Sequence, residues 1–216
     1  MVRRLAYSAL VASVDVIWAC SASRIAGPAR GQGQLAMALT DAPTPFDSIR
    51  EVNVFVQRID ARRAQSDSAE ANTDIENERD EDHDRPDSTL WVTIAKPNKS
   101  FDLLALQNGV TAFLGSTVVD TGSFKGIRLV IDPAKSTVVL KDGTVLSTTS
   151  KPPIEFETRE RRGLLVELNE KVEVKEGQTS TITIDFRLGD SMSLIGRTIR
   201  DGFFFRPVIK GSRKND

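Results

Sequence analysis

The feature that most constrains the fold is an alternation of apolar and other side chains that recurs along the chain. Val52, Val54 and Val56 are separated by single residues, and residues 35–39 show the same period of two. Successive side chains of a β-strand point to opposite faces, so this period predicts strands with one buried face. Pro43 and Pro45 disfavour a helix between these two segments.

Further strands are predicted in many short segments. A hairpin is predicted around Asp142-Gly143, because this dipeptide stands between two β-rich runs. Pro207 interrupts the last strand pattern, which places it at an edge or a strand end. The predicted strands lie in residues 35–39, 52–56, 89–95, 126–132, 136–148, 151–158, 163–168, 171–186 and 203–211. Nine or ten short strands without a long helix predict an all-β fold, an antiparallel β-sandwich of immunoglobulin-like or transthyretin-like type over residues 32–211, with a tail at 212–216.

The amino terminus has the layout of a secretory signal. Arg3 and Arg4 precede an apolar stretch, and the sequence "IWAC" ends at Cys20, the only cysteine of the chain. "IWAC" resembles the lipobox of bacterial lipoproteins, which implies a signal peptide over residues 1–20 and a lipid on Cys20. An export signal with an incidental cysteine and a cytoplasmic helix are the alternatives. Residues 21–31 are rich in Gly, Ala and Ser, which predicts a flexible tether.

A lipidated Cys20 would make a membrane the first partner of the protein, because acyl chains bind bilayers through their buried methylene groups. Ser21 follows the cysteine, which by resemblance to other lipoproteins suggests the outer membrane; the periplasm and the cell surface are the other expected locations. The formal net charge is −1, so no basic excess points to nucleic acid.

Residues 66–88 form an acidic tract. Ten acidic residues stand against two arginines, which gives a charge of −8, and Ile75 is the one large apolar residue. Such a segment cannot bury enough apolar surface to offset the entropy of ordering it. We therefore predict a disordered acidic loop inserted between two strands.

Metal binding within this tract has only weak candidates. Asp80, Asp82 and Asp84 match the first three ligand positions of a calcium loop. Arg85 and Trp91 then replace the glycine and the glutamate that such a loop requires, so only loose calcium binding remains as an alternative. The single histidine, His83, is expected to be an exposed loop residue.

Several longer stretches occur together in one order: "LAMALTDAPTPFDSIREVNVFVQRID" from residue 35, "FDLLALQNGV" from residue 101, "GSFKGIRLVID" from residue 122 and "ITIDFRLGDS" from residue 182. This order resembles a bacterial lipoprotein family known as domain of unknown function 4382, over about residues 32–210. Phe124 stands at a usual tyrosine position, "RRGLLVEL" replaces a different segment, and the acidic insertion is long for the family. The resemblance implies a membrane-tethered, extracytoplasmic β-sandwich and no established activity.

The sequence contains no recognisable catalytic constellation. Ser191 lies in "GDSM", which is similar to the serine block of a lipase-esterase family, but no histidine follows it. No Walker loop and no dinucleotide-binding motif after a strand is present, so no cofactor is predicted. We expect the protein not to be an enzyme; a hydrolase is the least favoured alternative.

Two surface features are candidates for partner contact. Arg159, Arg161 and Arg162 could meet anionic headgroups, or could form a solvated turn. Phe204 alternates with Phe203 and Phe205, so one face of this segment is expected in the core. Phe204 would then be either an exposed partner-binding residue or a residue covered by a loop.

Three acidic residues lie at predicted turns and strand ends: Asp41, Asp47 and Asp102. Short acidic side chains at such positions usually accept hydrogen bonds from backbone N–H groups. We predict capping roles for them, with a shared cation site as the alternative. Taken together, the sequence predicts a non-enzymatic, membrane-anchored lipoprotein acting as a binding or structural module of the bacterial envelope, whose partner is an envelope protein or a glycan. A calcium-binding surface module is the second hypothesis.

Overall fold

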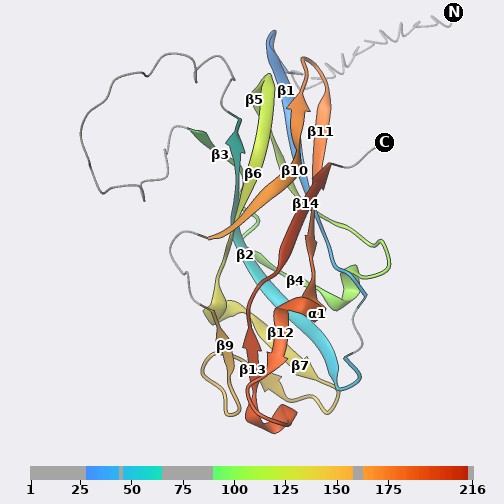
Figure 1. The fold of residues 1–216 in the computed structure, drawn as a ribbon, viewed down its shortest axis with the longest axis vertical. Coiled ribbons are helices and arrows are strands. Elements are labelled where there is room, and N and C mark those ends of the chain that lie inside the picture. Colours follow the sequence, from blue (N-terminus) through green and yellow to red (C-terminus); the bar gives the residue numbers. More distant parts are fainter. Residues whose placement is uncertain (1–27, 44–45, 65–89, 158–162, 214–216) are drawn as a thin grey trace, which may run out of the picture.

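The computed structural model describes residues 28–43, 46–64, 90–157 and 163–213, and these are built almost entirely of β-strands (Figure 1). The strands are β1 (Gln32–Thr40), β2 (Ile49–Arg63), β3 (Trp91–Ala95), β4 (Lys99–Asp102), β5 (Ala112–Asp120), β6 (Gly122–Ile131), β7 (Thr137–Leu140), β8 (Val145–Leu146), β9 (Ile154–Phe156), β10 (Leu164–Val174), β11 (Thr179–Phe186), β12 (Met192–Leu194), β13 (Phe203–Phe205) and β14 (Ile209–Arg213). The helical elements within the described ranges are α1 (Leu188–Ser191) and the 3₁₀ turns η3 (Leu104–Leu106), η4 (Pro133–Lys135) and η5 (Ile199–Asp201). The all-β class predicted from the sequence is confirmed.

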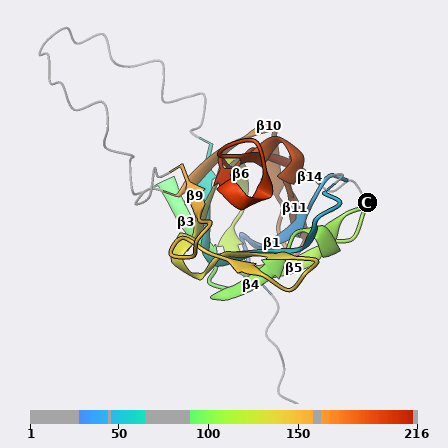
Figure 2. The same cartoon turned by 90° about the horizontal axis from the view of Figure 1, so that it is seen from below.

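Eleven of these strands form one curled sheet, in the order β5-β1-β11-β14-β10-β6-β2-β7-β8, with β3 and β4 paired to β2 as well. Seen along the long axis, its strands are arranged around a common centre (Figure 2). The sheet curls far enough for β3 to approach β5: a Cβ atom placed on Gly115 would lie 2.6 Å from the Cβ of Ala95. Gly115 therefore allows the two ends of the curl to pack against each other.

Strand β2 organises this sheet because it has partners on both edges along most of its length. β6 and β7 pair with one edge, while β3 and β4 pair with the other. The predicted inward face is confirmed, since Val52, Val54 and Val56 are all at most 2% exposed. β2 has 15 residues and is longer than the short strands that the sequence predicted.

The pairing differs in part from the antiparallel arrangement that was predicted. β1 pairs with β11 in parallel, as do β10 with β14 and β13 with β9. Each parallel pair joins segments distant in sequence, so local turn signals say nothing about it. The structure has fourteen strands within the described residues, more than the nine or ten predicted, because β4, β5 and β12 lie outside the segments predicted to be strands.

The predicted turns are confirmed. β7 and β8 form a hairpin around Asp142-Gly143, whose Gly143 has a φ of 90°. Asp142 accepts a hydrogen bond from the Thr144 N–H at 2.9 Å, and this contact lowers the pKa of Asp142. Pro207 lies between β13 and β14, outside both strands, as its missing N–H requires.

A second, small sheet has the order β12-β13-β9. It lies at the end of the long axis opposite the start of β1 (Figure 1). Phe205 in β13 joins this sheet to the main core, because its ring lies 5.8 Å from that of Phe186 in β11 and 5.0 Å from that of Phe156 in β9. The interior is thus one continuous apolar core shared by both sheets.

Several predicted features lie outside the described residues. These are the signal peptide, the lipidation site Cys20, the acidic tract with Asp80, Asp82, Asp84 and His83, and the basic cluster of Arg159, Arg161 and Arg162. Within the part of the chain that the structure describes, no helix is long and apolar enough to cross a membrane.

Candidate binding pocket

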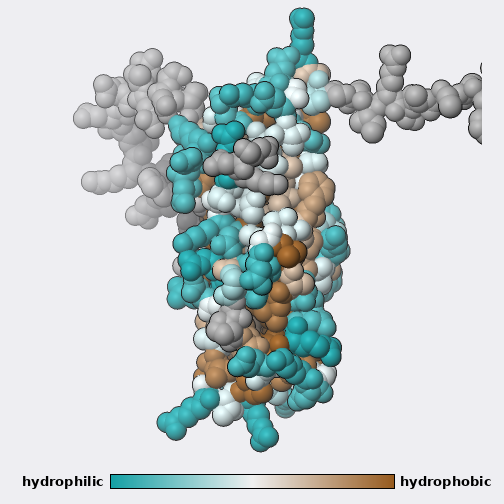
Figure 3. Space-filling model, turned by 90° about the vertical axis from the view of Figure 1, so that its right-hand side faces the viewer, coloured by the Kyte–Doolittle hydropathy of each residue, from teal (hydrophilic) through white to brown (hydrophobic). Residues whose placement is uncertain are grey.

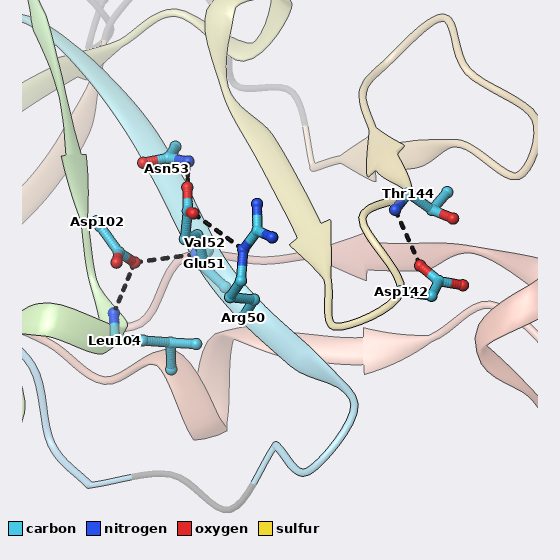
Figure 4. Close-up of polar contacts among 8 residues, drawn as sticks. All are labelled: Arg50, Glu51, Val52, Asn53, Asp102, Leu104, Asp142 and Thr144. Atoms are coloured by element: carbon cyan, nitrogen blue, oxygen red, sulfur yellow. Dashed lines mark hydrogen bonds and ion pairs between the residues drawn. The ribbon is translucent and has the colours of Figure 1, made fainter.

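Asp102 has the capping role that the sequence predicted. Its Oδ1 atom accepts hydrogen bonds from the N–H groups of Val52 at 3.0 Å and Leu104 at 3.1 Å (Figure 4). The carboxylate thereby joins the end of β4 to β2 and to the first residue of η3. This contact fixes the chain beyond β4 against the central strand.

Asp41 is also a cap, and it is buried. Its carboxylate accepts hydrogen bonds from the Leu188 N–H at 2.8 Å and from the Gln107 amide at 3.2 Å. Burial raises the pKa of Asp41 to about 6, an effect that these two hydrogen bonds oppose and the nearby Asp185 carboxylate reinforces. Burial likewise raises the pKa of Asp185, whose Oδ1 atom has no hydrogen-bond partner among the described residues. The end of β1 is thus fixed to the start of α1, which leads into the small sheet.

Asp47 is an exposed residue in the turn before β2, where it belongs to the lining of a pocket. No three His, Cys, Asp or Glu side chains within the described ranges could hold a metal ion together. The alternative of a cation site shared by Asp41, Asp47 and Asp102 is therefore wrong. Asp47 instead contributes to the lining of a pocket.

This pocket, here called the end pocket, has a volume of about 250 Å³ and lies beside the small sheet. Its floor is apolar and includes the buried Ile49, Met192 and Phe203. The complete lining is Phe46, Asp47, Ser48, Ile49, Met192, Ser193, Leu194, Ile199 and Phe203. Brown, apolar atoms gather in the same half of the molecule in the side view of Figure 3. A concave apolar floor with a few polar groups at the rim is typical of a ligand site.

The turn that carries Ile199 is fixed by a network centred on Asp201. The Oδ2 atom of Asp201 accepts hydrogen bonds from the N–H groups of Arg197 at 3.0 Å and Thr198 at 2.9 Å, and from the Thr198 hydroxyl at 3.1 Å. The contacts with Thr198 lower the pKa of Asp201, which keeps it ionised. Gly202 ends the turn with a φ of 99°, in a region that favours glycine. One wall of the end pocket is therefore preorganised.

Ser191 of the "GDSM" motif has a structural environment. It is 2% exposed, its hydroxyl donates to the Arg187 carbonyl at 2.7 Å, and it accepts from the Val208 N–H at 2.8 Å. These bonds join α1 to the segment before β14. They also fix the start of β12, which follows α1 directly.

The three adjacent phenylalanines of β13 differ in burial. Phe203 and Phe205 are buried, as predicted, and Phe203 contributes to the pocket floor. Phe204 is half-buried between Ser193 of β12 and Glu155 of β9 and does not line the pocket. Its predicted role in partner contact therefore remains a prediction.

Sequence reasoning missed most of the pocket. Leu194 and Ile195 are 40% and 42% exposed, in a segment where the sequence predicted no strand. Two adjacent large apolar residues within a polar, glycine-containing loop were the available signal. The other wall comes from residues 46–49, and nothing in the sequence indicates that the two segments meet.

A second missed feature is a charge network on the main sheet. Asp60 in β2 is 1% exposed and accepts hydrogen bonds from Thr93 Oγ1 and Arg128 Nε, each at 2.8 Å. The guanidinium of Arg128 lies 4.5 Å from the centre of the Trp91 ring. Asp60 looked like an ordinary polar position in an alternating strand, because its partners come from β3 and β6.

The fold and the pocket define an all-β protein with a curled main sheet, a small end sheet and an apolar end pocket. The chain belongs to the family described as Domain of unknown function (DUF4382), whose family model matches residues 32–207. This confirms the family resemblance seen in the sequence. Searches of curated proteins and of solved structures gave no significant match.

Proposed function

We propose that the protein is a non-enzymatic, membrane-anchored lipoprotein of the bacterial envelope that holds a partner, an envelope protein or a glycan, at the end pocket. In this proposal Cys20 carries the lipid, and the domain works outside the cytoplasm at the outer membrane, in the periplasm or at the cell surface. The main sheet would act as a rigid spacer between the anchor and the partner.

One observation carries the proposal: β12 and β13, which contribute residues to the lining of the end pocket, lie at the end of the long axis opposite the start of β1 (Figure 1). A chain anchored ahead of β1 would direct that end away from the membrane. The order of segments along the chain agrees with such an orientation, because the lipobox-like "IWAC" precedes the first strand.

We further propose that the curled sheet is a β-sandwich of immunoglobulin-like or transthyretin-like type. In support of this, the spatial order of the sheet divides between β14 and β10. The group β5, β1, β11 and β14 is joined there to the group β10, β6, β2, β7 and β8 by a single paired position, Leu168 with Gly211. Such a weak link favours a description as two facing sheets over one core.

The anchor is tested by metabolic labelling of the full chain with radioactive palmitate. We expect label in the wild-type chain and in Ser21→Ala, and none in Cys20→Ala. Label that persists in Cys20→Ala contradicts the anchor.

The binding end is tested by photo-crosslinking of the full chain in intact cells. A photoreactive amino acid at position 194, on the rim of the end pocket, is compared with one at Leu165, which is 65% exposed on β10. We expect a discrete crosslinked product from position 194 and none from position 165. Equal products at both positions contradict a partner bound at the pocket.

A further inference from the structure

The outer edge of β12 has backbone groups available for pairing. Hydrogen bonds from the Ile195 N–H to Gly202 and from the Arg206 N–H to Ser191 show that the odd-numbered positions 191–195 bond toward β13. Backbone groups alternate in direction along a strand, so the N–H and C=O of Leu194 point to the opposite edge. Among the described residues no partner meets them there, because β12 is the last strand of the small sheet.

The end pocket opens beside this edge, since Met192, Ser193 and Leu194 line it. Its volume of about 250 Å³ suits one long side chain and is too small for a whole strand. An extended chain paired with β12 would thus lie at the mouth, with one side chain inside. Strand addition of this kind takes its affinity from main-chain hydrogen bonds and its specificity from a side-chain pocket.

The rim of the end pocket favours a positively charged side chain. Asp47 is the one ionisable residue of the lining, and it makes no hydrogen bond or ion pair with other residues that the structure describes. Ser48 and Ser193 add two hydroxyl groups to the lining. A lysine ammonium has three N–H donors, which a carboxylate and two hydroxyls can accept, while its apolar stem suits the floor. Lys141 and Arg200 are exposed at this end but are not part of the lining.

We propose that an extended segment of a partner protein pairs with the outer edge of β12 and inserts a lysine side chain into the end pocket, with its ammonium at Asp47. This inference rests on the proposed function and chooses the protein over the glycan as partner. It assigns Asp47 to charge recognition and Leu194 to backbone pairing.

The test measures binding of fluorescein-labelled nonapeptides to the full chain by fluorescence anisotropy. The probe peptide alternates threonine and valine around a central lysine; three matched peptides carry norleucine, glutamate or N-methylated bonds flanking the lysine. We expect the lysine peptide to bind about tenfold tighter than the norleucine peptide and the glutamate peptide to bind most weakly. N-methylation should weaken binding at least tenfold, because it removes strand pairing.

Variants assign the site. Asp47→Asn should lower affinity for the lysine peptide about tenfold and leave the norleucine peptide unchanged, so the preference for lysine disappears. The control Asp120→Asn removes an equal charge from the exposed end of β5 and should change neither affinity.

Three results overturn the inference: a glutamate peptide that binds as well as the lysine peptide, an N-methylated peptide with full affinity, or n-pentylammonium that displaces the probe as effectively as the unlabelled peptide does. The last result would identify a small amphipathic cation as the ligand. Absence of binding by every peptide, together with a crosslink at position 194, refutes the lysine segment and leaves the proposed function in place.

Discussion

The carboxylate of Asp41 accepts a hydrogen bond from the backbone N–H of Leu188 at 2.8 Å, across 147 positions of sequence. This bond joins the end of β1 to the first residue of α1. Because α1 leads directly into β12, the contact connects the main sheet to the wall of the end pocket.

The first prediction concerns the pH dependence of this contact. Burial raises the pKa of Asp41 to about 6 from an ordinary 3.8, so the folded protein binds the proton more tightly than the unfolded chain does. The contribution to stability is full below pH 3.8 and is lost as the pH rises through about 6. We expect Asp41→Asn to flatten the change in unfolding free energy between pH 4 and 7 by about 2 kcal/mol. Urea unfolding at several pH values measures this.

The matched control for that series is Asp47→Asn, which removes one exposed carboxylate. If Asp41→Asn keeps the wild-type slope while both variants stay folded, the assignment of the raised pKa to Asp41 is wrong.

The second prediction concerns the junction between the two sheets. Phe205 is 2% exposed and contacts Phe186 and Phe156, so Phe205→Ala should cost about 3–5 kcal/mol of stability. The comparison is Phe113→Ala on β5, where the side chain is 63% exposed and the expected change is within about 0.5 kcal/mol. Chemical denaturation of both variants decides it; equal losses would show that the small sheet does not share the main core.

The third prediction concerns the approach of β3 to β5. Gly115 has a φ of 141°, and an added Cβ would lie 2.6 Å from that of Ala95. Gly115→Ala should lower stability by about 1–3 kcal/mol through overpacking and backbone strain. The double variant with Ala95→Gly relieves only the overpacking, so thermal denaturation should show a partial rescue. No rescue at all would place the whole cost in the backbone conformation.

The fourth prediction concerns the charge network of Asp60. Asp60→Ala leaves Arg128, whose side chain is 19% exposed, without its carboxylate, and should cost about 3 kcal/mol. Asp120→Ala removes a carboxylate that is 75% exposed and 3.8 Å from Arg63, with an expected cost below about 1 kcal/mol. Urea denaturation compares the two. A small loss at Asp60 would mean that water replaces the carboxylate.

The sequence predicts strands well where a period of two extends over several residues, as in β1, β2 and β11. It does not predict β12, whose three residues are too few to show a period. Parallel partners such as β1 and β11 lie far apart in the chain, and no turn signals their pairing. Short-range motifs therefore define the class of the fold and leave its strand order open.

The candidate site shows the same division. Asp41, Asp47 and Asp102 are recognisable as residues of turns and strand ends from their neighbours, and two of them are caps in the structure. The end pocket could not be predicted, because residues 46–49 meet Met192 and Phe203 only once the main sheet has curled. Leu194 indicates a binding surface only once the structure shows that this apolar side chain is exposed.

The direction of β1 has a mechanical consequence. β1 runs along the long axis between β5 and β11, with seven paired positions to β11 and eight to β5 (Figure 1). A pulling force that enters at Gln32 and leaves at the opposite end acts parallel to these strands, so the ladder bonds are loaded in shear and must rupture together rather than one by one. Such a domain resists extension. If Cys20 carries the proposed lipid anchor, the far end of the domain would stay folded under a force applied through the anchor.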